Sequence, residues 1–252
     1  FDKLYFLRLI LIMFSYYGSK AKVVQYYPSP TTLKIREAFA GSARYSVMYW
    51  DTPDILLMDK YQVIVDVWHY LQRASQQDIL GLSRIKIDER ISEVYSKDSI
   101  EYKFLGFLTQ AGQGKPADKF SSYRNNEMLQ KQLKKIASNL YKIKHWKIIQ
   151  GSYEDLENED ATWFIDPPYE KMGVHQYQYN SKTIDFNSLA NWCKSRLGQV
   201  IVCENLDATW LNFKPLINFR GSINNNTEAI WTNFPTQYDS VQQELFSWAG
   251  GK

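Results

Sequence analysis

The stretch Phe164-Ile165-Asp166-Pro167-Pro168-Tyr169 decides how this chain can fold. An apolar strand runs to an acid and is then stopped by two prolines, because proline fixes φ and has no backbone N–H. In an open parallel sheet, ligands bind just beyond the carboxyl ends of the strands. The sequence therefore predicts that Asp166 lies at a binding edge, in a stiff turn whose carbonyls point outward.

Such a turn can hold a planar ring that carries an amino group. Asp166 and the carbonyl of Pro167 would accept the two amino hydrogens, and Tyr169 would stack on the ring. An ordinary strand exit at Pro167-Pro168, without any ligand, is the competing interpretation. The tetrapeptide alone favours neither of the two.

Short apolar runs predict the strands around this turn. They are Lys34–Phe39, Asp54–Met58, Trp146–Gln150, Trp163–Asp166 and Gln199–Cys203. Helical spacing of apolar residues lies between them in Lys60–Arg73 and Phe186–Leu197, with Leu197 on the apolar face. Strands that alternate with helices predict an α/β fold with a mostly parallel, doubly wound sheet.

The C-terminal part predicts an antiparallel hairpin. Phe219–Ile223 and Glu228–Asn233 flank the polar run Asn224-Asn225-Asn226, which we expect to form the turn. This hairpin would close one edge of the sheet.

The middle of the chain has a different character. It is polar, it contains a loop with Gly and Lys at Gln110–Lys119, and a basic helix follows through Lys131, Lys134 and Lys135. We expect residues 72–145 to form a helical insertion outside the sheet, and residues 1–71 and 146–252 to form the core domain. A solvated helical lid without a ligand is the alternative.

Composition sets broad limits. The 252 residues are 44% hydrophobic and carry a net charge of +3, which suits one α/β domain with a small insertion. This mildly basic balance permits a polyanionic partner without requiring one. Aromatic residues make up 15% of the chain, and besides building cores they can stack on nucleobases.

Cysteine and histidine usage predicts no metal site and a reducing, cytoplasmic setting. Cys193, Cys203 and the three histidines match no metal-ligand spacing, and no disulfide framework is visible. The apolar stretch Leu4–Phe14 is too short to span a bilayer and is interrupted by Arg8. We expect it to be a buried element that leads into a functional loop, and we expect no membrane association.

A small-residue turn follows the first predicted strand at Arg36–Ala43. Small residues let the backbone approach a ligand closely, here around Phe39 and Gly41. The turn lacks the pattern Gly-x-Gly-x-x-Gly, which disfavours a dinucleotide as its ligand.

Two further signals point to the same edge. Asp59 ends the second predicted strand, where an acid holds ribose hydroxyls, although it could equally cap the next helix. The run Tyr16-Tyr17-Gly18-Ser19-Lys20 could cover an aromatic ligand and reach a carboxylate. A plain surface turn explains that run equally well.

Taken together, the four motifs resemble the Dam-like, alpha-class family of DNA adenine N6-methyltransferases. The resemblance extends from about Phe14 to Pro235, and Glu228–Asn233 is similar to the family's late strand. It implies a Rossmann-like, S-adenosylmethionine-dependent methyltransferase fold with an inserted DNA-recognition subdomain. It also implies methyl transfer to the exocyclic amino group of adenine in double-stranded DNA after base flipping, by an enzyme of the kind found in restriction–modification systems.

The resemblance assigns roles by position. Cofactor contacts are expected from Tyr16, Tyr17, Gly18, Lys20, Phe39, Gly41, Asp59, Ser152, Tyr153 and Asp166. The catalytic residues that hold the flipped adenine are expected to be Asp166, Pro167, Pro168 and Tyr169. DNA contacts are expected from Lys115, Lys119, Arg124, Lys131, Lys134, Lys135 and Lys182. Base readout is expected from Gln110–Tyr123, and we expect a monomer.

Three departures from the family pattern stand out. Gly151-Ser152-Tyr153 has serine where relatives place an acid, and Ala43 replaces a second glycine after Gly41. The insertion also lacks the Arg-Tyr-Asn and Phe-Asn-x-Pro-x-Gly patterns of GATC-reading relatives, so GATC is not predicted. Two other functions are open: an RNA adenine or protein glutamine methyltransferase, and a DNA-binding relative without catalytic activity.

Overall fold

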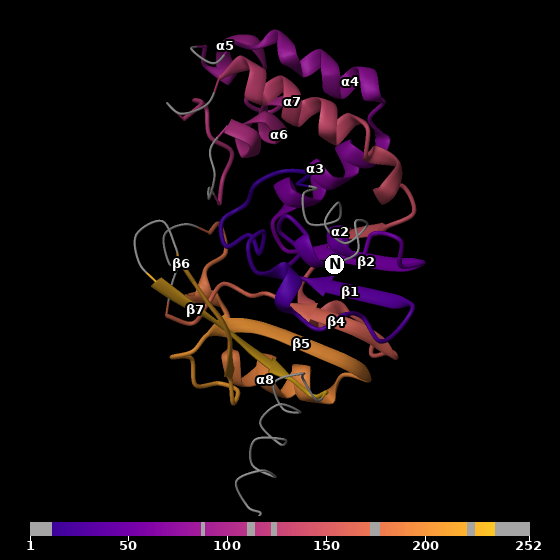
Figure 1. The fold of residues 1–252 in the computed structure, drawn as a ribbon, viewed down its shortest axis with the longest axis vertical. Coiled ribbons are helices and arrows are strands. Elements are labelled where there is room, and N and C mark those ends of the chain that lie inside the picture. The colour runs from indigo at the N-terminus through magenta and orange to yellow at the C-terminus, as the bar shows by residue number, and fades with distance from the viewer. Residues whose placement is uncertain are drawn as a thin grey trace, which may run out of the picture.

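The computed structural model describes residues 12–86, 89–109, 114–121, 125–171, 177–220 and 225–234. Within these ranges seven strands form one sheet in the order β3-β2-β1-β4-β5-β7-β6 (Figure 1). The strands are β1 Lys34–Ala38, β2 Asp54–Asp59, β3 Lys147–Gln150, β4 Ala161–Ile165, β5 Gly198–Asn205, β6 Lys214–Arg220 and β7 Asn225–Thr232.

The first five strands are parallel, and the last two are added at one edge. β1 pairs in parallel with β2 on one side and with β4 on the other. β7 runs antiparallel to both β5 and β6. The strand order therefore reverses between β1 and β4, which is the position where open α/β sheets bind their ligands.

Helices connect the strands and extend away from the sheet. The α-helices are α2 Arg44–Met48, α3 Gln62–Arg73, α4 Gln76–Gly81, α5 Ile91–Val94, α6 Ile100–Thr109, α7 Asn126–Ala137 and α8 Phe186–Ser195. Five 3₁₀ turns complete the described chain: η1 Val24–Tyr26, η2 Leu82–Arg84, η3 Leu140–Ile143, η4 Tyr153–Asp155 and η5 Ser181–Thr183.

Alternate residues of the central strands build a core on each face of the sheet, because successive strand side chains point to opposite sides. On β4, Phe164 belongs to the core cluster that includes Trp68 of α3. Its neighbours Trp163 and Ile165 belong to the cluster that includes Cys193 of α8. This two-sided burial explains why the predicted strands read as continuous apolar runs.

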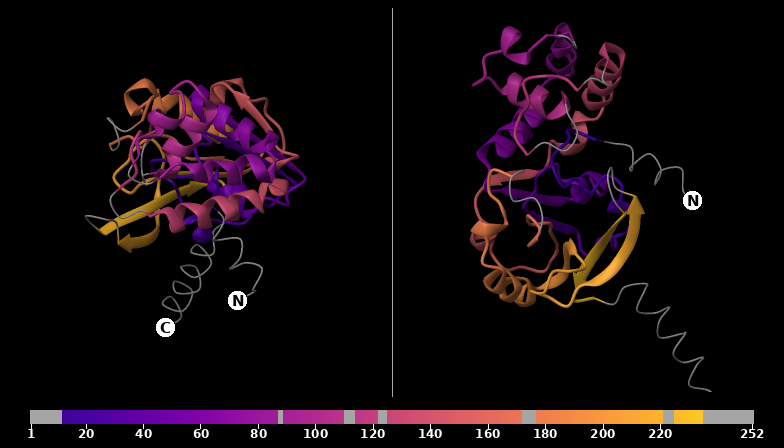
Figure 2. Two further views of the ribbon diagram at one scale, coloured as in Figure 1. Left: turned by 90° about the horizontal axis from the view of Figure 1, so that it is seen from above. Right: turned by 90° about the vertical axis from the view of Figure 1, so that its left-hand side faces the viewer.

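The helices α4 to α7 form a subdomain outside the sheet, at the end of the molecule that Figures 1 and 2 show above it. Helix α6 packs on α3, and α4 packs on α7. The chain leaves and re-enters the core at one place, since Gln72 donates from Nε2 to the carbonyls of Ile143 (3.0 Å) and Trp146 (2.8 Å). The insertion is therefore attached next to β3.

The C-terminal hairpin is present, but its predicted bounds were wrong. Strand β6 begins at Lys214 rather than Phe219, and β7 already includes Asn225 and Asn226, which we had placed in the turn. Pairing along a neighbouring strand overrides the low strand propensity of asparagine. The remaining predicted turn and strand residues, 221–224, lie outside the described residues.

Helix α8 is also shorter than predicted. It ends at Ser195, and Leu197, which we had placed on its apolar face, is 55% exposed. The next strand begins at Gly198 with a φ of +82°, so the chain must turn sharply here. The spacing of apolar residues in the sequence does not reveal such a turn, which is why the predicted helix was too long.

The predicted fold class is confirmed: the chain has an α/β, Rossmann-like fold with a mostly parallel sheet and a helical insertion. Met13 and Phe14 are buried, as expected for the end of the N-terminal apolar stretch, of which residues 4–11 lie outside the described ones. Within the described part of the chain, every helix is too short or too polar to cross a membrane.

Candidate functional site

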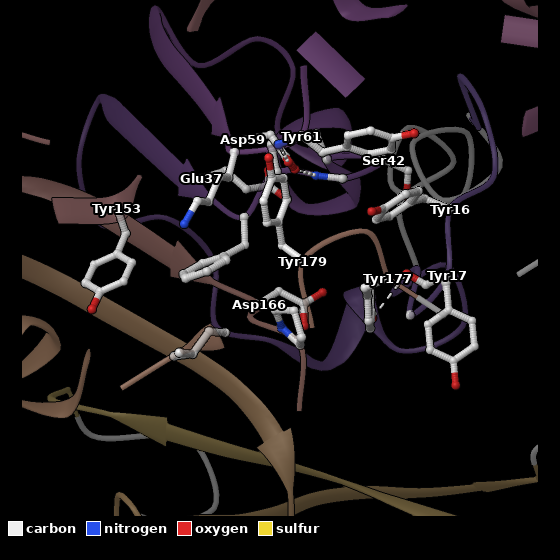
Figure 3. Close-up of a pocket in the computed structure, with 18 of the residues that line it drawn as sticks. Tyr16, Tyr17, Glu37, Ser42, Asp59, Tyr61, Tyr153, Asp166, Tyr177 and Tyr179 are labelled. Atoms are coloured by element: carbon white, nitrogen blue, oxygen red, sulfur yellow. Dashed lines mark hydrogen bonds between the residues drawn. The ribbon is translucent and has the colours of Figure 1, made fainter. Parts of the chain in front are cut away.

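A cavity of about 240 Å³ opens at the carboxyl ends of β1, β2, β3 and β4. Figure 3 shows Asp59 and Tyr61 on one side of it and Asp166 on the other, with Tyr153 at one end and Tyr16 and Tyr17 at the opposite end. These elements meet because parallel strands deliver their carboxyl ends to the same edge of the sheet. The cavity therefore lies at the point where the strand order reverses.

The loop after β1 has an unusual backbone. Phe39 (φ 60°), Gly41 (φ 48°) and Ala43 (φ 44°) all have positive φ, which costs energy for every residue except glycine. The indole Nε1 of Trp68 donates to the Gly41 carbonyl at 2.9 Å, and Ala40 N donates to Met58 O at 2.9 Å. The loop is thus fixed from the sheet and from α3.

Asp59 organises this loop from the end of β2. Its Oδ2 accepts the N–H of Gly41 and its Oδ1 accepts the N–H of Tyr61, both at 2.8 Å. Burial raises the pKa of Asp59 to about 6, although the two backbone hydrogen bonds oppose the rise. Each oxygen keeps a second acceptor position, which suits the hydroxyl groups of a ribose.

Asp166 forms a buried ion pair with Lys20. Their Oδ1 and Nζ atoms are 2.7 Å apart, and Nζ also donates to the Gly18 carbonyl at 3.0 Å. Burial raises the pKa of Asp166 to about 6, while the Lys20 charge lowers it. Asp166 is therefore ionised at neutral pH and acts as a hydrogen-bond acceptor.

Tyr169 is anchored behind the cavity. Its hydroxyl donates to Oε1 of Glu228, which also accepts the hydroxyl of Tyr27 at 2.6 Å. The Lys20 ammonium lies 4.5 Å from the centre of the Tyr169 ring. The ring is thereby held at both its face and its hydroxyl.

Ser152, the first departure from the family pattern, is a helix cap. Its backbone N–H donates to Oδ2 of Asp155 at 2.7 Å, and the two residues form a capping box for η4. The next residue, Tyr153, stacks on Phe39 with ring centres 5.5 Å apart and planes at 28°. Phe39 and Tyr153 thus form an aromatic wall of the cavity. Glu154 also lines the cavity and supplies an acid, which Gly151-Ser152-Tyr153 does not contain.

The N-terminal segment closes another side of the cavity. A Cβ on Gly18 would meet the hydroxyl of Tyr177, and a Cβ on Gly41 would meet the Tyr16 ring at 2.9 Å. Ser42 donates from Oγ to Ser19 Oγ at 3.1 Å. Positive φ favours glycine at both positions, and the Tyr16 ring is a further constraint at Gly41.

Glu37 on β1 is a site residue that our sequence analysis missed. It is buried, its Oε2 accepts the backbone N–H and the hydroxyl of Ser46, and it lines the cavity. Burial raises its pKa to about 8, although the Ser46 hydrogen bonds lower it. Its position near the end of β1, two residues before Phe39 of the turn, was the available signal.

The structure brings together all ten predicted cofactor-binding residues around the cavity. Of the four predicted catalytic residues, Asp166 and Pro168 line it, whereas Pro167 is buried and Tyr169 lies behind it. Several further lining residues were not predicted: Ser19, Glu37, Ser42, Arg44, Lys60, Tyr61, Glu154, Phe164, Tyr177, Tyr179, Thr183, Ile184 and Asp185.

Among the described residues, the lysines predicted to contact DNA are not part of the cavity lining. Lys115, Lys119, Lys131, Lys134 and Lys182 are exposed, and Arg124 lies outside the described residues.

Two of the lysines that were predicted to contact DNA, both on α7, are less available for an external contact. Lys131 pairs with Glu127 at 2.6 Å on the helix surface. Lys135 is half-buried, and burial together with the nearby charges of Arg44 and Lys142 lowers its pKa. Lys134 is therefore better placed than Lys135 for an external contact.

Part of the predicted base-reading loop is firmly attached to the subdomain. In residues 114–121, Ala117 N donates to Gly106 O and Ser121 N donates to Thr109 O, each at 3.2 Å. Asp118 accepts from the backbone N–H of Ser92 at 2.9 Å. Residues 110–113 and 122–124 of this loop lie outside the described residues.

In the ranges that the structure describes, no three or more His, Cys, Asp and Glu side chains are arranged to hold a metal ion. The two cysteines are buried, and Cys203 is part of the core.

Comparison with family models and with curated proteins finds no match for the chain. Among solved structures it is similar to a "conserved hypothetical protein" of Streptococcus pyogenes, at 11% identity and a TM-score of 0.31, over 78% of this chain and 84% of the other. It is also similar to the "Putative methyltransferase yhhF from Escherichia coli", at 11% identity and a TM-score of 0.32, over 84% of this chain and 78% of that one. At these values the fold assignment rests on the strand order itself.

Proposed function

We propose that the protein transfers a methyl group from S-adenosylmethionine to the exocyclic amino group of adenine in DNA, as a member of the Dam-like family. The observation that carries this proposal is the placement of Asp166. It stands at the strand-order reversal, on a turn stiffened by Pro167 and Pro168, and shares one cavity with Asp59 and the β1 loop. An acceptor for an amino group thus faces a site that suits a nucleoside.

The cavity fits the cofactor in its chemistry. Asp59 offers acceptors for ribose hydroxyls, and the aromatic wall of Phe39 and Tyr153 suits an adenine ring or an aliphatic chain. Five acids line the cavity, Asp59 and Asp166 among them, against the three basic residues Lys20, Arg44 and Lys60, and this excess of acids favours a cationic ligand. S-adenosylmethionine is such a cation.

Asp166 does the central work of the proposed mechanism. As an ionised acceptor it would accept a hydrogen bond from the adenine amino group, and the carbonyl of Pro167 would accept a second one, so that the nitrogen lone pair is released from conjugation with the ring. S-adenosylmethionine, when bound, would supply an electrophilic methyl group: the N–C bond would form as the S–C bond breaks, with the bond electrons left on sulfur, and the cationic amino group would then lose one proton to solvent. The chain contributes orientation and electrostatics, and no covalent enzyme intermediate is required.

The remaining roles concern the nucleic acid. An adenine can reach Asp166 only after it is flipped out of the helix, which costs a few kcal/mol. The exposed lysines of the insertion, such as Lys115 and Lys134, would supply salt-dependent phosphate contacts. Lys182 is exposed next to Thr183, which lines the cavity, and would contact DNA near the flipped base.

Labelled methyl transfer tests this function. The protein is incubated with tritiated S-adenosylmethionine and, separately, with mixed-sequence DNA, RNA and a glutamine-containing peptide, and the DNA is digested to identify the labelled base. We expect label in N6-methyladenine from DNA. Label only in RNA or peptide would identify the other substrate classes, and cofactor binding without transfer would identify an inactive relative.

Asp166→Ala tests the site within this reaction. Loss of a preorganised group at the reacting centre is expected to lower kcat by roughly 10²- to 10³-fold. The exposed residue Asp207, which follows β5 and does not line the cavity, gives the matched control Asp207→Ala with unchanged kcat. Wild-type kcat in Asp166→Ala, with the melting temperature preserved, would reject the proposed site.

A further inference from the structure

Glu228 is a buried acid on β7, outside the motifs that define the site. It is 5% exposed and pairs with Asn205 of β5 and Ile217 of β6. A carboxylate in such a position loses its hydration, and this cost has to be offset by specific partners. Its partners are therefore informative.

One of those partners is in the turn that carries Asp166, and the other two are in the N-terminal segment. Oε1 of Glu228 accepts the hydroxyl of Tyr169, 59 residues earlier in the chain, and the hydroxyl of Tyr27 at 2.6 Å. The Lys20 ammonium lies 4.0 Å from the same oxygen. Glu228 thus meets the last residue of the Asp-Pro-Pro-Tyr turn and the cation that pairs with its first residue.

The resulting arrangement fixes both ends of the turn. Lys20 holds Asp166 at 2.7 Å, and Glu228 holds Tyr169 through its hydroxyl. The two prolines stiffen the segment between these anchors. Burial opposes the charge of Lys20, but the carboxylates of Asp166 and Glu228 raise its pKa, so the lysine stays charged between them.

We propose that Glu228 is a positioning residue that fixes Tyr169 and the Lys20 ammonium, so that the turn already holds Asp166 in the geometry that accepts the amino group of the target base. This role rests on the proposed function, because Tyr169 ends the turn whose first residue, Asp166, is assigned to hold the adenine. A turn that is free to move would have to be ordered during each catalytic cycle, and a hydrogen bond at the Tyr169 hydroxyl removes that requirement. Glu228 acts through Tyr169 and Lys20 and does not itself line the cavity.

Three variants separate this role from a purely structural one. Tyr169→Phe keeps the ring and removes its anchor. Glu228→Gln keeps an acceptor oxygen and removes the negative charge. Tyr27→Phe is the matched control, because it removes the other hydroxyl from the same oxygen of Glu228 without touching the turn. We also include the double variant of Glu228→Gln and Tyr169→Phe.

The measurements are kcat and KM for adenine-containing DNA at saturating S-adenosylmethionine, the cofactor Kd and the melting temperature. We expect Glu228→Gln and Tyr169→Phe each to lower kcat by roughly three- to tenfold, the effect of one hydrogen bond, with the cofactor Kd unchanged. The double variant should be no slower than the slower single variant, because both act on one contact. Tyr27→Phe should keep kcat within about twofold while lowering the melting temperature.

Two results would overturn the proposal. Equal losses of melting temperature in Glu228→Gln and Tyr27→Phe with wild-type kcat in both would show a structural carboxylate only. Effects on kcat that simply add in the double variant would show that Glu228 does not act through Tyr169. Failure of the proposed function is distinguishable, because the wild-type protein itself would then transfer no methyl group to DNA.

Discussion

At the scale of single residues, the buried pair of Lys20 and Asp166 decides what the site can do. Burial raises the pKa of Asp166 to about 6, and the adjacent lysine prevents a larger rise. A protonated acid would offer a donor where the amino group needs an acceptor. The lysine thus keeps the acid ionised in the pH range where the proposed reaction takes place.

Lys20→Met should shift the pH dependence of methyl transfer. Without the lysine charge the pKa of Asp166 rises further. The acidic limb of the kcat profile at saturating cofactor should therefore lie at a higher pH than in the wild-type protein, where the pKa of Asp166 is about 6. Measuring kcat from pH 5 to 9 checks this, with exposed Lys22→Met as the control. An acidic limb at the same pH in the Lys20→Met and wild-type profiles would show that Asp166 is not the titrating group.

At the scale of elements, the loop after β1 holds a residue other than glycine in a left-handed conformation. Ala43 has φ 44° and ψ 50°, just before α2. The hydrogen bonds that Asp59 and Trp68 make to Gly41 hold the loop in place. Ala43 is therefore kept in a strained conformation that glycine would adopt at lower cost.

Ala43→Gly and Gly41→Ala should have opposite effects. Ala43→Gly relieves the strain of the left-handed conformation, whereas the greater conformational freedom of glycine in the unfolded chain offsets part of this gain. The net effect should be a free energy of unfolding that is higher by about 0.5–1 kcal/mol. Gly41→Ala places a Cβ 2.9 Å from the Tyr16 ring and should lower both stability and cofactor affinity. Urea unfolding and cofactor titration measure the two effects; destabilisation by Ala43→Gly would contradict the loop conformation.

At the scale of the whole molecule, acids that are buried near the carboxyl edge of the sheet make folding sensitive to pH. Burial raises the pKa of Glu37 to about 8, of Glu204 to about 7, and of Asp59 and Asp166 to about 6. At pH values between the ordinary carboxyl pKa and these raised pKa values, the folded state therefore binds more protons than the unfolded state. By linkage, stability falls as the pH rises through this window.

We expect the melting temperature without ligand to be several degrees higher at pH 5.5 than at pH 8.5. The ion pair of Lys20 does not reverse this trend, since its raised pKa makes its contribution constant below the usual lysine pKa. Glu37→Gln removes the largest of these shifts and should flatten the profile. Differential scanning calorimetry across this range decides; a melting temperature that rises with pH would refute the expectation.

Much of the site could be read from local sequence. Strand runs that alternate with helical spacing place Asp59 and Asp166 at the ends of parallel strands, and such ends share one edge of the sheet. Small residues and prolines predict tight turns wherever they occur in a chain. The fold class followed from these local rules, whereas the set of expected cofactor-binding residues came from the resemblance to the Dam-like family.

The partners of those residues were decided only by tertiary structure. Glu228 and Tyr27 are 201 residues apart, and nothing local links them. Ser152 became a helix cap and β7 began at Asn225 because neighbouring segments set their hydrogen bonding. Sequence by itself determined which side chains reach the edge of the sheet, since strand period and turn chemistry are local. The packed fold decided which of them bury, pair and change their pKa, because burial and charge pairing depend on segments that are distant in the chain.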